Sequence, residues 1–515
     1  MSTSCGIEDF LPVEQHAEEM PTAVAVTAPG REPITYRELG RLLPRMRSEL
    51  TEAGLGPGEI AALVLPNGAD LITTFLAVSG IGAGAPLNPA STESEFRFYL
   101  SRLGARMVIV PDGVASPAAA AAQELGISVL RIRSTPEDAA GTFTWSQQEN
   151  AAPALSVRKT DASLLLFTSA TTGAPKLIPR TWAGLRAMAA REIVASELCA
   201  SDCLLSLMPL FHNHGLAAAL AQLFCGGAVI GTAGFHPATF LDWMGQFRPT
   251  WFTTSSPLNR AILAQAREHP EVFRRAPLRL IRTTGAQPRP EMIGELEEAV
   301  GVPVLSGYGL TETGGVTRET PTARKPGSAG RSSGLDVSIM DPLGNLLAAD
   351  REGEIVVRGA SVISGYLDEP EANQVCFRDG WFHTGDLGHL DSEGFLFITG
   401  RLKEMINRGG EKILPQGVEE VLMEHPAVAE AAVFAVAHST LGEDVAAAVV
   451  LRDGAAASAL ELRQFAATRL ALFKVPRRIV LVDGIPRTAT GKLRRAVLAE
   501  QFSNRMPDRP DPGKA

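Results

Sequence analysis

Residues 167–176 read FTSATTGAPK and begin at the end of the apolar run 164–167. Hydroxyl side chains, a glycine and one lysine in a loop that leaves a strand are typical of a phosphate cradle. Hydroxyls, backbone N–H groups and an ammonium group all bind phosphate oxygens. The spacing does not match GxxxxGK[ST], so this stretch does not predict a P-loop NTPase. The sequence therefore predicts a phosphate site of another kind.

Composition limits the remaining possibilities. A chain of 515 residues predicts two or more domains, and 45% hydrophobic with 20% charged residues is typical of a globular protein. The net charge of −9 argues against nucleic acid and membrane surfaces as partners. No apolar run reaches the ~18 residues of a membrane span and no leader pattern opens the chain. We expect a cytoplasmic protein. The five cysteines form no CxxC pair or metal cluster.

Lysine usage points to particular places in the chain. Only 8 of the 48 basic residues are lysines, so arginine supplies most of the positive charge. A compact ammonium group and a planar guanidinium group are not interchangeable in binding sites. Six of the eight lysines lie in or beside Gly-, Thr- or Pro-rich motifs: Lys176, Lys325, Lys403, Lys412, Lys474 and Lys492.

The pattern along the chain predicts an α/β fold. Apolar runs alternate with amphipathic stretches up to about residue 400, including a helix at 36–52, a strand at 164–167 and a surface helix at 118–124. Short alternating strands near residues 351–400 predict a small β subdomain. From 403 to 502 the pattern predicts an α+β unit whose helix from Ser458 uses that serine as N-cap. We therefore expect domains at 1–402 and 403–502, and a disordered tail at 503–515.

Five further groups of motifs follow the phosphate loop in order. They are FHNHG at 211–215; TTGAQP at 283–288 with GYGLTET at 307–313; WFHTGDLG at 381–388; GRLKEMINRGGEKI at 400–413; and FKVP at 473–476 with PRTATGKLRR at 486–495. In kind and order they resemble the motifs of the adenylate-forming family (acyl-CoA synthetases, adenylation domains and luciferases). That family's phosphate loop usually reads TSGTTGxPKG, so Ala170 and Leu177 stand here where glycine is usual.

The resemblance implies a large N-terminal α/β domain of layered sheets and helices, a small mobile C-terminal domain, and a nucleotide site. Tyr308 would stack on adenine, Asp386 would accept the ribose hydroxyls, and Arg401 would reach ribose or phosphate. The other nucleotide-binding residues would be Thr168, Ser169, Thr171, Thr172, Gly173 and Lys176 in the phosphate loop, and Gly285, Ala286, Gln287, Gly307 and Gly309 on the adenine side.

The resemblance also implies catalytic roles. Lys492 would bridge the substrate carboxylate and the α-phosphate, where charge spreads in the transition state. Glu312 would hold Mg²⁺, which prefers one or two carboxylates together with phosphate oxygens, and Thr311 would contact phosphate. His212 would line the acyl pocket or gate the thiol tunnel; a packed histidine without a catalytic role is the alternative.

The last motifs imply a second half-reaction with coenzyme A. Lys403 would lie at the pivot of the C-terminal domain. Gly409 and Gly410 would let the backbone approach the pantetheine arm, since glycine permits close approach. Three cations would contact the phosphates of coenzyme A: Arg408, Lys412 and Lys474.

The sequence thus predicts a stand-alone carboxylic acid–CoA ligase that uses ATP, Mg²⁺ and coenzyme A. No charged anchor for a second carboxylate stands out, which favours a hydrophobic acid, and the Arg- and Ala-rich usage hints at natural-product biosynthesis. Three alternatives remain. Ala170 could weaken adenylation, so that a partner enzyme supplies the acyl-adenylate; a separate carrier protein could replace coenzyme A; or the chain could bind adenylate without catalysis.

Overall fold

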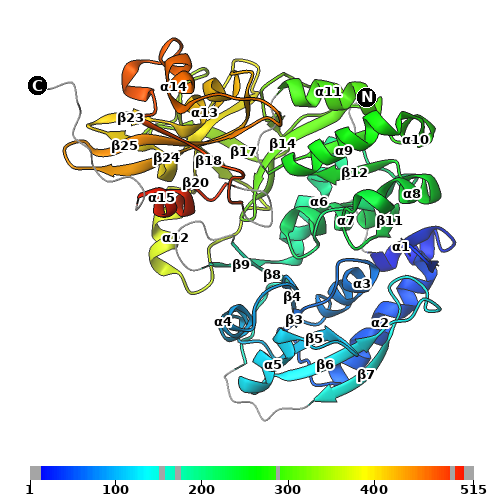
Figure 1. Cartoon of the computed structure of the whole chain (residues 1–515). Coiled ribbons are helices and arrows are strands. Elements are labelled where there is room, and N and C mark those ends of the chain that lie inside the picture. The colour runs from blue at the N-terminus through cyan, green and yellow to red at the C-terminus, as the bar shows by residue number, and fades with distance from the viewer. Residues whose placement is uncertain (1–12, 150–156, 169–174, 286–289, 488–492, 504–515) are drawn as a thin grey trace, which may run out of the picture. The chain divides into compact units, whose positions relative to one another are not determined.

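The computed structural model describes residues 13–149, 157–168, 175–285, 290–487 and 493–503 (Figure 1). The chain forms two compact units. Of the described residues, unit 1 comprises those within 13–168, 175–336 and 357–382, and unit 2 comprises those within 337–356 and 383–503. Helices and sheets alternate along the chain, which confirms the predicted α/β class. The predicted domain boundary at residue 402 stays a prediction, and residues 504–515 of the predicted tail lie outside the described residues.

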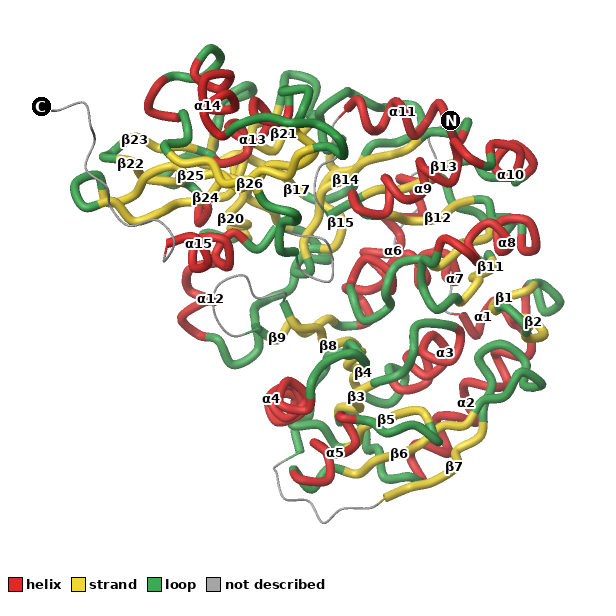
Figure 2. Tube along the Cα trace, in the orientation of Figure 1, coloured by secondary structure: helices red, strands yellow, loops and turns green. Residues whose placement is uncertain are grey.

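Unit 1 contains two large sheets whose central strands are parallel and buried on both faces (Figure 2). This burial explains their continuous apolar sequences. The nine-stranded sheet has the order β16 (Arg331–Ser332), β15 (Gly314–Arg318), β14 (Val304–Leu310), β13 (Leu280–Thr283), β12 (Trp251–Thr254), β10 (Cys203–Ser206), β11 (Ala228–Gly231), β1 (Val24–Ala28), β2 (Arg31–Thr35). The seven-stranded sheet has the order β7 (Thr144–Glu149), β6 (Ser128–Arg133), β5 (Met107–Pro111), β3 (Ile60–Leu63), β4 (Ala83–Pro86), β8 (Leu164–Phe167), β9 (Leu177–Arg180).

Helices cover and separate these sheets (Figure 1). One hydrophobic cluster joins Leu63 of β3, Phe75 of α3, Leu220 of α7 and Leu204 of β10, so α3 and α7 pack between the sheets. The helices of unit 1 are α1 (Val13–Glu19), α2 (Tyr36–Glu52), α3 (Ala69–Val78), α4 (Glu93–Leu103), α5 (Pro117–Glu124), α6 (Trp182–Ser196), α7 (Asn213–Phe224), α8 (Pro237–Phe247), α9 (Ser256–Glu268), α10 (Pro270–Arg275), α11 (Pro290–Val300) and α12 (Pro370–Cys376).

Two helices show where local sequence succeeds and fails. Helix α2 has the predicted bounds because Thr35 and Glu38 form a capping box at its start. Helix α5 was expected on the surface; Gln123 and Glu124 are exposed as expected, but the opposite face of the helix is buried. Its alanines at 118, 119, 121 and 122 are buried against the core of the seven-stranded sheet. Small side chains let this helix pack closely, and alanine content alone cannot distinguish that from exposure.

Unit 2 holds most of a five-stranded sheet and all of a second one. The first has the order β17 (Asp336–Met340), β18 (Gly353–Arg358), β20 (Trp381–Leu390), β19 (Phe377–Arg378), with β21 (Leu396–Arg401) also on β20. The second has the order β23 (Glu411–Ile413), β22 (Ile406–Arg408), β25 (Gly442–Leu451), β24 (Val428–His438), with β26 (Arg478–Leu481) on β25. Its helices are the 3₁₀ turns η2 (Leu402–Glu404) and η3 (Leu472–Lys474), and α13 (Pro415–Met423), α14 (Ala459–Ala467) and α15 (Arg495–Ser503).

Other expectations can be checked directly. Ser458 caps α14 in a capping box with Glu461, as predicted. The four described cysteines are free thiols. Among the helices that the structure describes, none combines the length and apolarity needed to cross a membrane.

Candidate active site

The phosphate loop connects β8 and β9, which pair as an antiparallel hairpin (Figure 2). Its neck is closed twice. The Thr168 N–H donates to the Lys176 carbonyl oxygen at 2.9 Å, and the Lys176 N–H donates to Thr168 Oγ1 at 2.9 Å. The loop therefore starts and ends at one fixed point. Its tip lies outside the described residues: Ser169, Ala170, Thr171, Thr172 and Gly173.

Lys176 and Leu177 face different surroundings. Lys176 Nζ lies 4.6 Å from the ring centroid of Tyr366, in a cation–π arrangement. Leu177, which stands where the family usually has glycine, is fully buried in the core of the seven-stranded sheet. It pairs with Phe167 in the hairpin and forms a β-bridge with Leu367. Leu177 is thus a core residue of β9.

Glu312 lies beside the same tyrosine. Its residue is only 9% exposed, and its Oε1 accepts a 2.8 Å hydrogen bond from the Tyr366 hydroxyl. Arg180, at the end of β9, donates to the carbonyl oxygens of Thr311 and Ser361. The structure therefore brings together three residues predicted from sequence: Lys176, Thr311 and Glu312. It also adds Tyr366 and Arg180, which sequence reasoning missed.

The charge states in this cluster follow from its burial. Burial raises the pKa of the Tyr366 hydroxyl well above its usual range, and the neighbouring Glu312 and Cys376 raise it further. Tyr366 is consequently a hydrogen-bond donor throughout the physiological pH range. Burial lowers the pKa of Arg180 to about 10, and the Glu312 charge opposes this change. Arg180 is therefore a cation at neutral pH.

The residues present fit a magnesium ion that arrives with a nucleotide. No group of three His, Cys, Asp or Glu side chains within the described ranges could hold a metal alone. Mg²⁺ prefers one or two carboxylates and completes its shell with water and phosphate oxygens. Glu312 Oε1 accepts the tyrosine hydrogen bond, and no hydrogen bond between described residues uses its Oε2. One carboxylate oxygen of Glu312, whose tyrosine partner also contacts Lys176, suits such a shared ion.

The adenine-side residues converge from two strands of unit 1. Thr284 Oγ1 donates to the Gly307 carbonyl oxygen at 3.2 Å, which ties the end of β13 to β14. Gly285 follows with a φ of +109° and open space where a Cβ would stand. A Cβ at Gly309 would lie 2.3 Å from the Gly314 carbonyl oxygen, so only glycine allows β15 to pair there. Tyr308 lies between Gly307 and Gly309 in β14 and is 9% exposed. Ala286 and Gln287 lie outside the described residues.

The two predicted ribose-binding residues, both in unit 2, face each other across paired strands. Asp386 of β20 pairs with Arg401 of β21, and Arg401 Nε lies 2.6 Å from Asp386 Oδ1. Asp386 is 3% exposed, and its N–H donates to Thr384 Oγ1. The guanidinium group of Arg401 thus holds the buried Asp386 carboxylate in place.

The hinge and coenzyme A motifs lie together in unit 2. Gly409 and Gly410 form the turn of the β22–β23 hairpin with φ of +61° and +99°. Two positive φ values match the tight turns that favour glycine pairs. Gly409 N–H donates to the Leu441 carbonyl oxygen. Lys403, in η2, and Lys412, in β23, are exposed.

Arg408 connects this hairpin to the FKVP motif. Its Nε donates to Asp444 Oδ1 at 2.6 Å, and its Nη1 donates to the Phe473 carbonyl oxygen at 3.5 Å. Lys474 follows directly in η3. Arg477 also lies 3.7 Å from Asp444 Oδ2. Sequence reasoning missed Asp444 because β25 lies far from both motifs in the chain.

His212 and His214 start α7 but differ in environment. His212 is the N-cap residue, and its ring centroid lies 4.6 Å from that of Phe211. Burial lowers the pKa of His214 to about 4, against the attraction of Glu192. Glu192 in turn binds Arg282 at 3.0 Å and Arg318 at 2.5 Å. His214 is therefore neutral at physiological pH.

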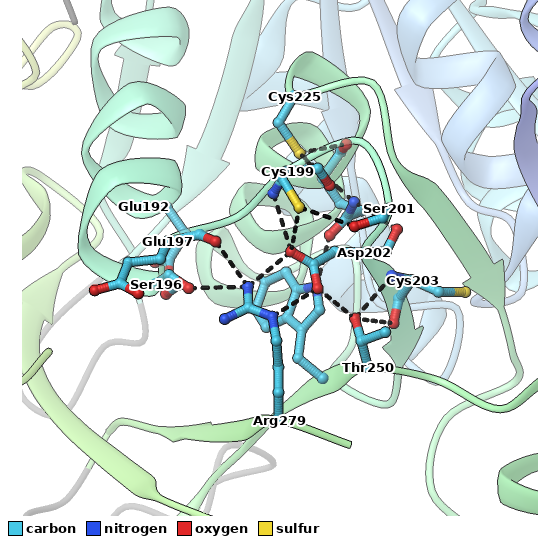
Figure 3. A network of polar contacts seen from close by, with 12 residues as sticks. Glu192, Ser196, Glu197, Cys199, Ser201, Asp202, Cys203, Cys225, Thr250 and Arg279 are labelled. Carbon is cyan, nitrogen blue, oxygen red and sulfur yellow. Dashed lines mark hydrogen bonds and ion pairs between the residues drawn. The ribbon is translucent and has the colours of Figure 1, made fainter. Parts of the chain in front are cut away.

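A second network anchors the start of β10 (Figure 3). Arg279 donates to both carboxylate oxygens of Asp202 at 2.7 Å. It also donates to the carbonyl oxygens of Ser196 and Glu197. These contacts tie the end of α6 to the strand layer, and they include no residue predicted to bind a ligand. We interpret this network as structural.

Comparison with known proteins gives concordant results. The family model described as AMP-binding enzyme matches residues 13–367, and the AMP-binding enzyme C-terminal domain matches residues 417–492. The chain is 36% identical over 504 residues to the oxalate–CoA ligase of Arabidopsis thaliana, covering 95% of this chain and 98% of that protein. It is 31% identical over 512 residues to the long-chain-fatty-acid–CoA ligase FadD13 of Mycobacterium tuberculosis, covering 96% and 98%. The o-succinylbenzoate coenzyme A synthetase of Bacillus subtilis, solved with ATP and magnesium ion, superposes with a TM-score of 0.79 at 28% identity, covering 94% and 98%.

Proposed function

Because this chain belongs to the family of AMP-binding enzymes and is an acid–thiol ligase of its acyl-CoA ligase group, we propose that it joins a hydrophobic carboxylic acid to coenzyme A through an acyl-adenylate. The observation that carries this proposal is the convergence of Lys176, Tyr366 and Glu312 at the neck of the phosphate loop. In this proposal Lys176 would contact the triphosphate, and Glu312 would hold the metal ion bound to it.

The proposed reaction has two balanced steps. In the first, a substrate carboxylate oxygen attacks the α-phosphorus of ATP, and pyrophosphate leaves with the electrons of the broken P–O bond. In the second, the thiol of coenzyme A loses its proton and attacks the acyl carbonyl carbon, and AMP leaves. Lys492, outside the described residues, is proposed to stabilise the charge that spreads over carboxylate and α-phosphate.

Each motif then has a task in the first step. The phosphate loop and Lys176 would bind the β- and γ-phosphates, and Tyr308 and Asp386 would bind adenine and ribose. Glu312 would hold Mg²⁺, with Thr311 on phosphate beside it. When bound, the ion neutralises phosphate charge and so lowers the barrier to attack at phosphorus.

The second step would use the opposite face of the C-terminal domain. Lys403, exposed in the short 3₁₀ turn that follows β21, is the proposed pivot, since hinges lie in connecting segments or at the ends of elements. The turn at Gly409 and Gly410 would leave room for the pantetheine arm to run beside the backbone. Arg408, Lys412 and Lys474 would attract the phosphates of coenzyme A.

The choice of a hydrophobic acid rests on the sequence, in which no charged anchor for a second carboxylate stands out. Arg282 and Arg318 are bound by Glu192, and Arg191 donates to the carbonyl oxygens of Thr313 and Gly315. Each guanidinium group is therefore held within the chain, although Arg191 Nε, Arg282 Nη2 and Arg318 Nε have no hydrogen-bond partner among the described residues.

An acid panel tests the substrate class. With ATP, Mg²⁺ and coenzyme A, loss of free thiol should be fastest with aliphatic or aromatic monocarboxylic acids. A preference for oxalate or another short dicarboxylic acid would overturn the hydrophobic assignment.

The proposed location is the cytoplasm, where ATP and coenzyme A are both abundant.

The alternative that adenylation is weakened has one specific observation in its favour, namely Ala170 in the phosphate loop. A carrier protein as thiol acceptor would be revealed if a carrier-bound thiol, and not coenzyme A, released AMP.

A further inference from the structure

Residues 361–367, here called the 361–367 strap, connect the phosphate hairpin to the Thr311–Thr313 turn. The Ile363 N–H donates to the Glu312 carbonyl oxygen at 3.0 Å, and the Leu367 N–H donates to the Leu177 carbonyl oxygen at 2.9 Å. Ser361 joins the same arrangement, because its hydroxyl donates to the Thr313 carbonyl oxygen at 2.6 Å. The strap is thus bonded both to the strand that follows the phosphate loop and to the residue that carries the metal-binding carboxylate.

The strap presents one large polar side chain. Tyr366 is 7% exposed, and its backbone is held in both directions by Asn373, at 2.7 Å from the N–H and 2.8 Å from the carbonyl oxygen. Its ring packs edge-on against Phe377, with centroids 5.7 Å apart. The position of the ring is therefore fixed before any ligand arrives.

This fixed ring contacts both charged groups of the phosphate site. Its face receives Lys176 Nζ at 4.6 Å, and its hydroxyl donates to Glu312 Oε1 at 2.8 Å. A cation on an aromatic face keeps its N–H donors available on the other side. A carboxylate held at one oxygen presents the other oxygen in one direction.

We propose that Tyr366 is a positioning residue that holds Glu312 for the metal and Lys176 for the triphosphate, an inference that rests on the proposed function of those two residues. The Tyr366 hydroxyl orients Glu312 toward the metal through its hydrogen bond, and the Tyr366 ring holds the Lys176 ammonium group. These two actions can be separated, because phenylalanine removes only the first and leucine removes both.

The test is calorimetric binding of a non-cleavable ATP analogue to the full chain, with Mg²⁺ and with a chelator. For Tyr366→Phe we expect affinity with Mg²⁺ to fall about 10-fold or more, the loss typical of a hydrogen bond to a charged group. Its affinity in chelator should match the parent. Tyr366→Leu should lose affinity in both conditions. Equal losses for Tyr366→Phe in both conditions, or no loss in either, would overturn the inference.

Two further proteins separate this inference from the proposed function. Glu312→Gln should lose the same magnesium-dependent affinity, and adding Tyr366→Phe to it should cost no more. If Glu312→Gln keeps the magnesium effect, the assigned role of Glu312 fails. If Glu312→Gln loses it and Tyr366→Phe does not, the role of Glu312 stands and only the inference about Tyr366 fails.

Tyr36→Phe is the matched control. Tyr36 is also buried, and its hydroxyl donates to the carbonyl oxygens of Leu223 and Gly227, away from the phosphate site. Loss of the Tyr36 hydroxyl should lower the melting temperature without changing how the affinity for the ATP analogue depends on Mg²⁺. A magnesium effect in Tyr36→Phe would show that loss of a buried hydroxyl is enough, and would overturn the specific role of Tyr366.

Discussion

Thr168 and Lys176 are bonded to each other twice across the neck of the phosphate loop, through one backbone pair and one side-chain acceptor. They are eight positions apart in the chain, yet the two hydrogen bonds hold the loop ends as a closed hairpin. Because phosphate loops bind largely through backbone N–H groups, a fixed neck limits the conformations open to the loop.

The side-chain hydrogen bond across the loop neck can be removed by mutation. Thr168→Val deletes the hydroxyl that accepts from the Lys176 N–H and leaves the backbone bond. We expect ATP affinity to fall about 5- to 10-fold, for a net hydrogen-bond contribution near 1 kcal/mol. Equilibrium binding of ATP measures this.

Thr160→Val is its control, since Thr160 Oγ1 accepts from the Ala162 N–H just before β8. Its affinity for ATP should equal that of the parent. If both valine variants bind ATP as the parent does, the Thr168 side-chain hydrogen bond has no role in ATP binding.

Lys492→Ala should abolish adenylation of the acid by ATP and spare coenzyme A transfer from a supplied acyl-adenylate. The two half-reactions are proposed to use opposite faces of the C-terminal domain, and only one presents this lysine. Separate assays of acid-dependent pyrophosphate release and of thioester formation measure the two steps. Arg494→Ala removes a neighbouring charge and should leave both rates near the parent values. Equal loss of both steps in Lys492→Ala would contradict a rotating domain.

Gly409→Leu should have the reverse effect, slowing thioester formation and leaving adenylate formation nearly intact. A side chain at this turn would fill the proposed path of the pantetheine arm. The substitution is also strained, because Gly409 has a φ of +61° and its Cβ would lie 3.0 Å from Leu441 Cδ2.

Gly454→Leu controls for that strain, because Gly454 has a φ of +74° and open space around it. Both half-reactions of this control should be retained. Should Gly409→Leu lose adenylate formation as severely as thioester formation, Gly409 is only a structural turn.

His214 should make stability fall in mild acid. Its pKa is lowered from 6.5 to about 4, chiefly by burial. Between these values the unfolded chain binds a proton that the folded chain does not, so stability decreases as pH falls from 6.5 to 4. The full effect is about 3 kcal/mol. Melting temperatures from pH 4 to 8 should show a shallower acid decline for His214→Gln than for the parent, and parallel curves would contradict this.

The sequence was most informative where chemistry is local. The capping box of Thr35 and Glu38 defines the start of α2, and the apolar run 164–167 defines β8 with its observed bounds. The resemblance assigned Lys176 to phosphate and Glu312 to Mg²⁺, because each lies in a motif of fixed residue types. Their contact through Tyr366 could not, since 54 residues separate Tyr366 from Glu312 and only the folded strap joins them.

The same distinction holds in unit 2. The sequence singled out Gly409 and Gly410 as a place of close backbone approach, and the structure shows them as the turn of the β22–β23 hairpin. The carboxylate that holds Arg408 belongs to Asp444, which is 36 residues away on another strand and carries no local signal. Charge partners of this kind depend on strand order, which the alternation of apolar residues does not specify.

Acid-dependent exchange of labelled pyrophosphate into ATP tests most directly whether this chain makes an acyl-adenylate. The parent should catalyse exchange with a monocarboxylic acid, and coenzyme A should then convert the adenylate to thioester and AMP. Ala170→Gly, which restores the glycine usual at that position, should change the exchange rate by less than about 5-fold. Absence of exchange in the parent, together with thioester formation from a supplied acyl-adenylate, would contradict the two-step ligase and show an enzyme of thioesterification alone.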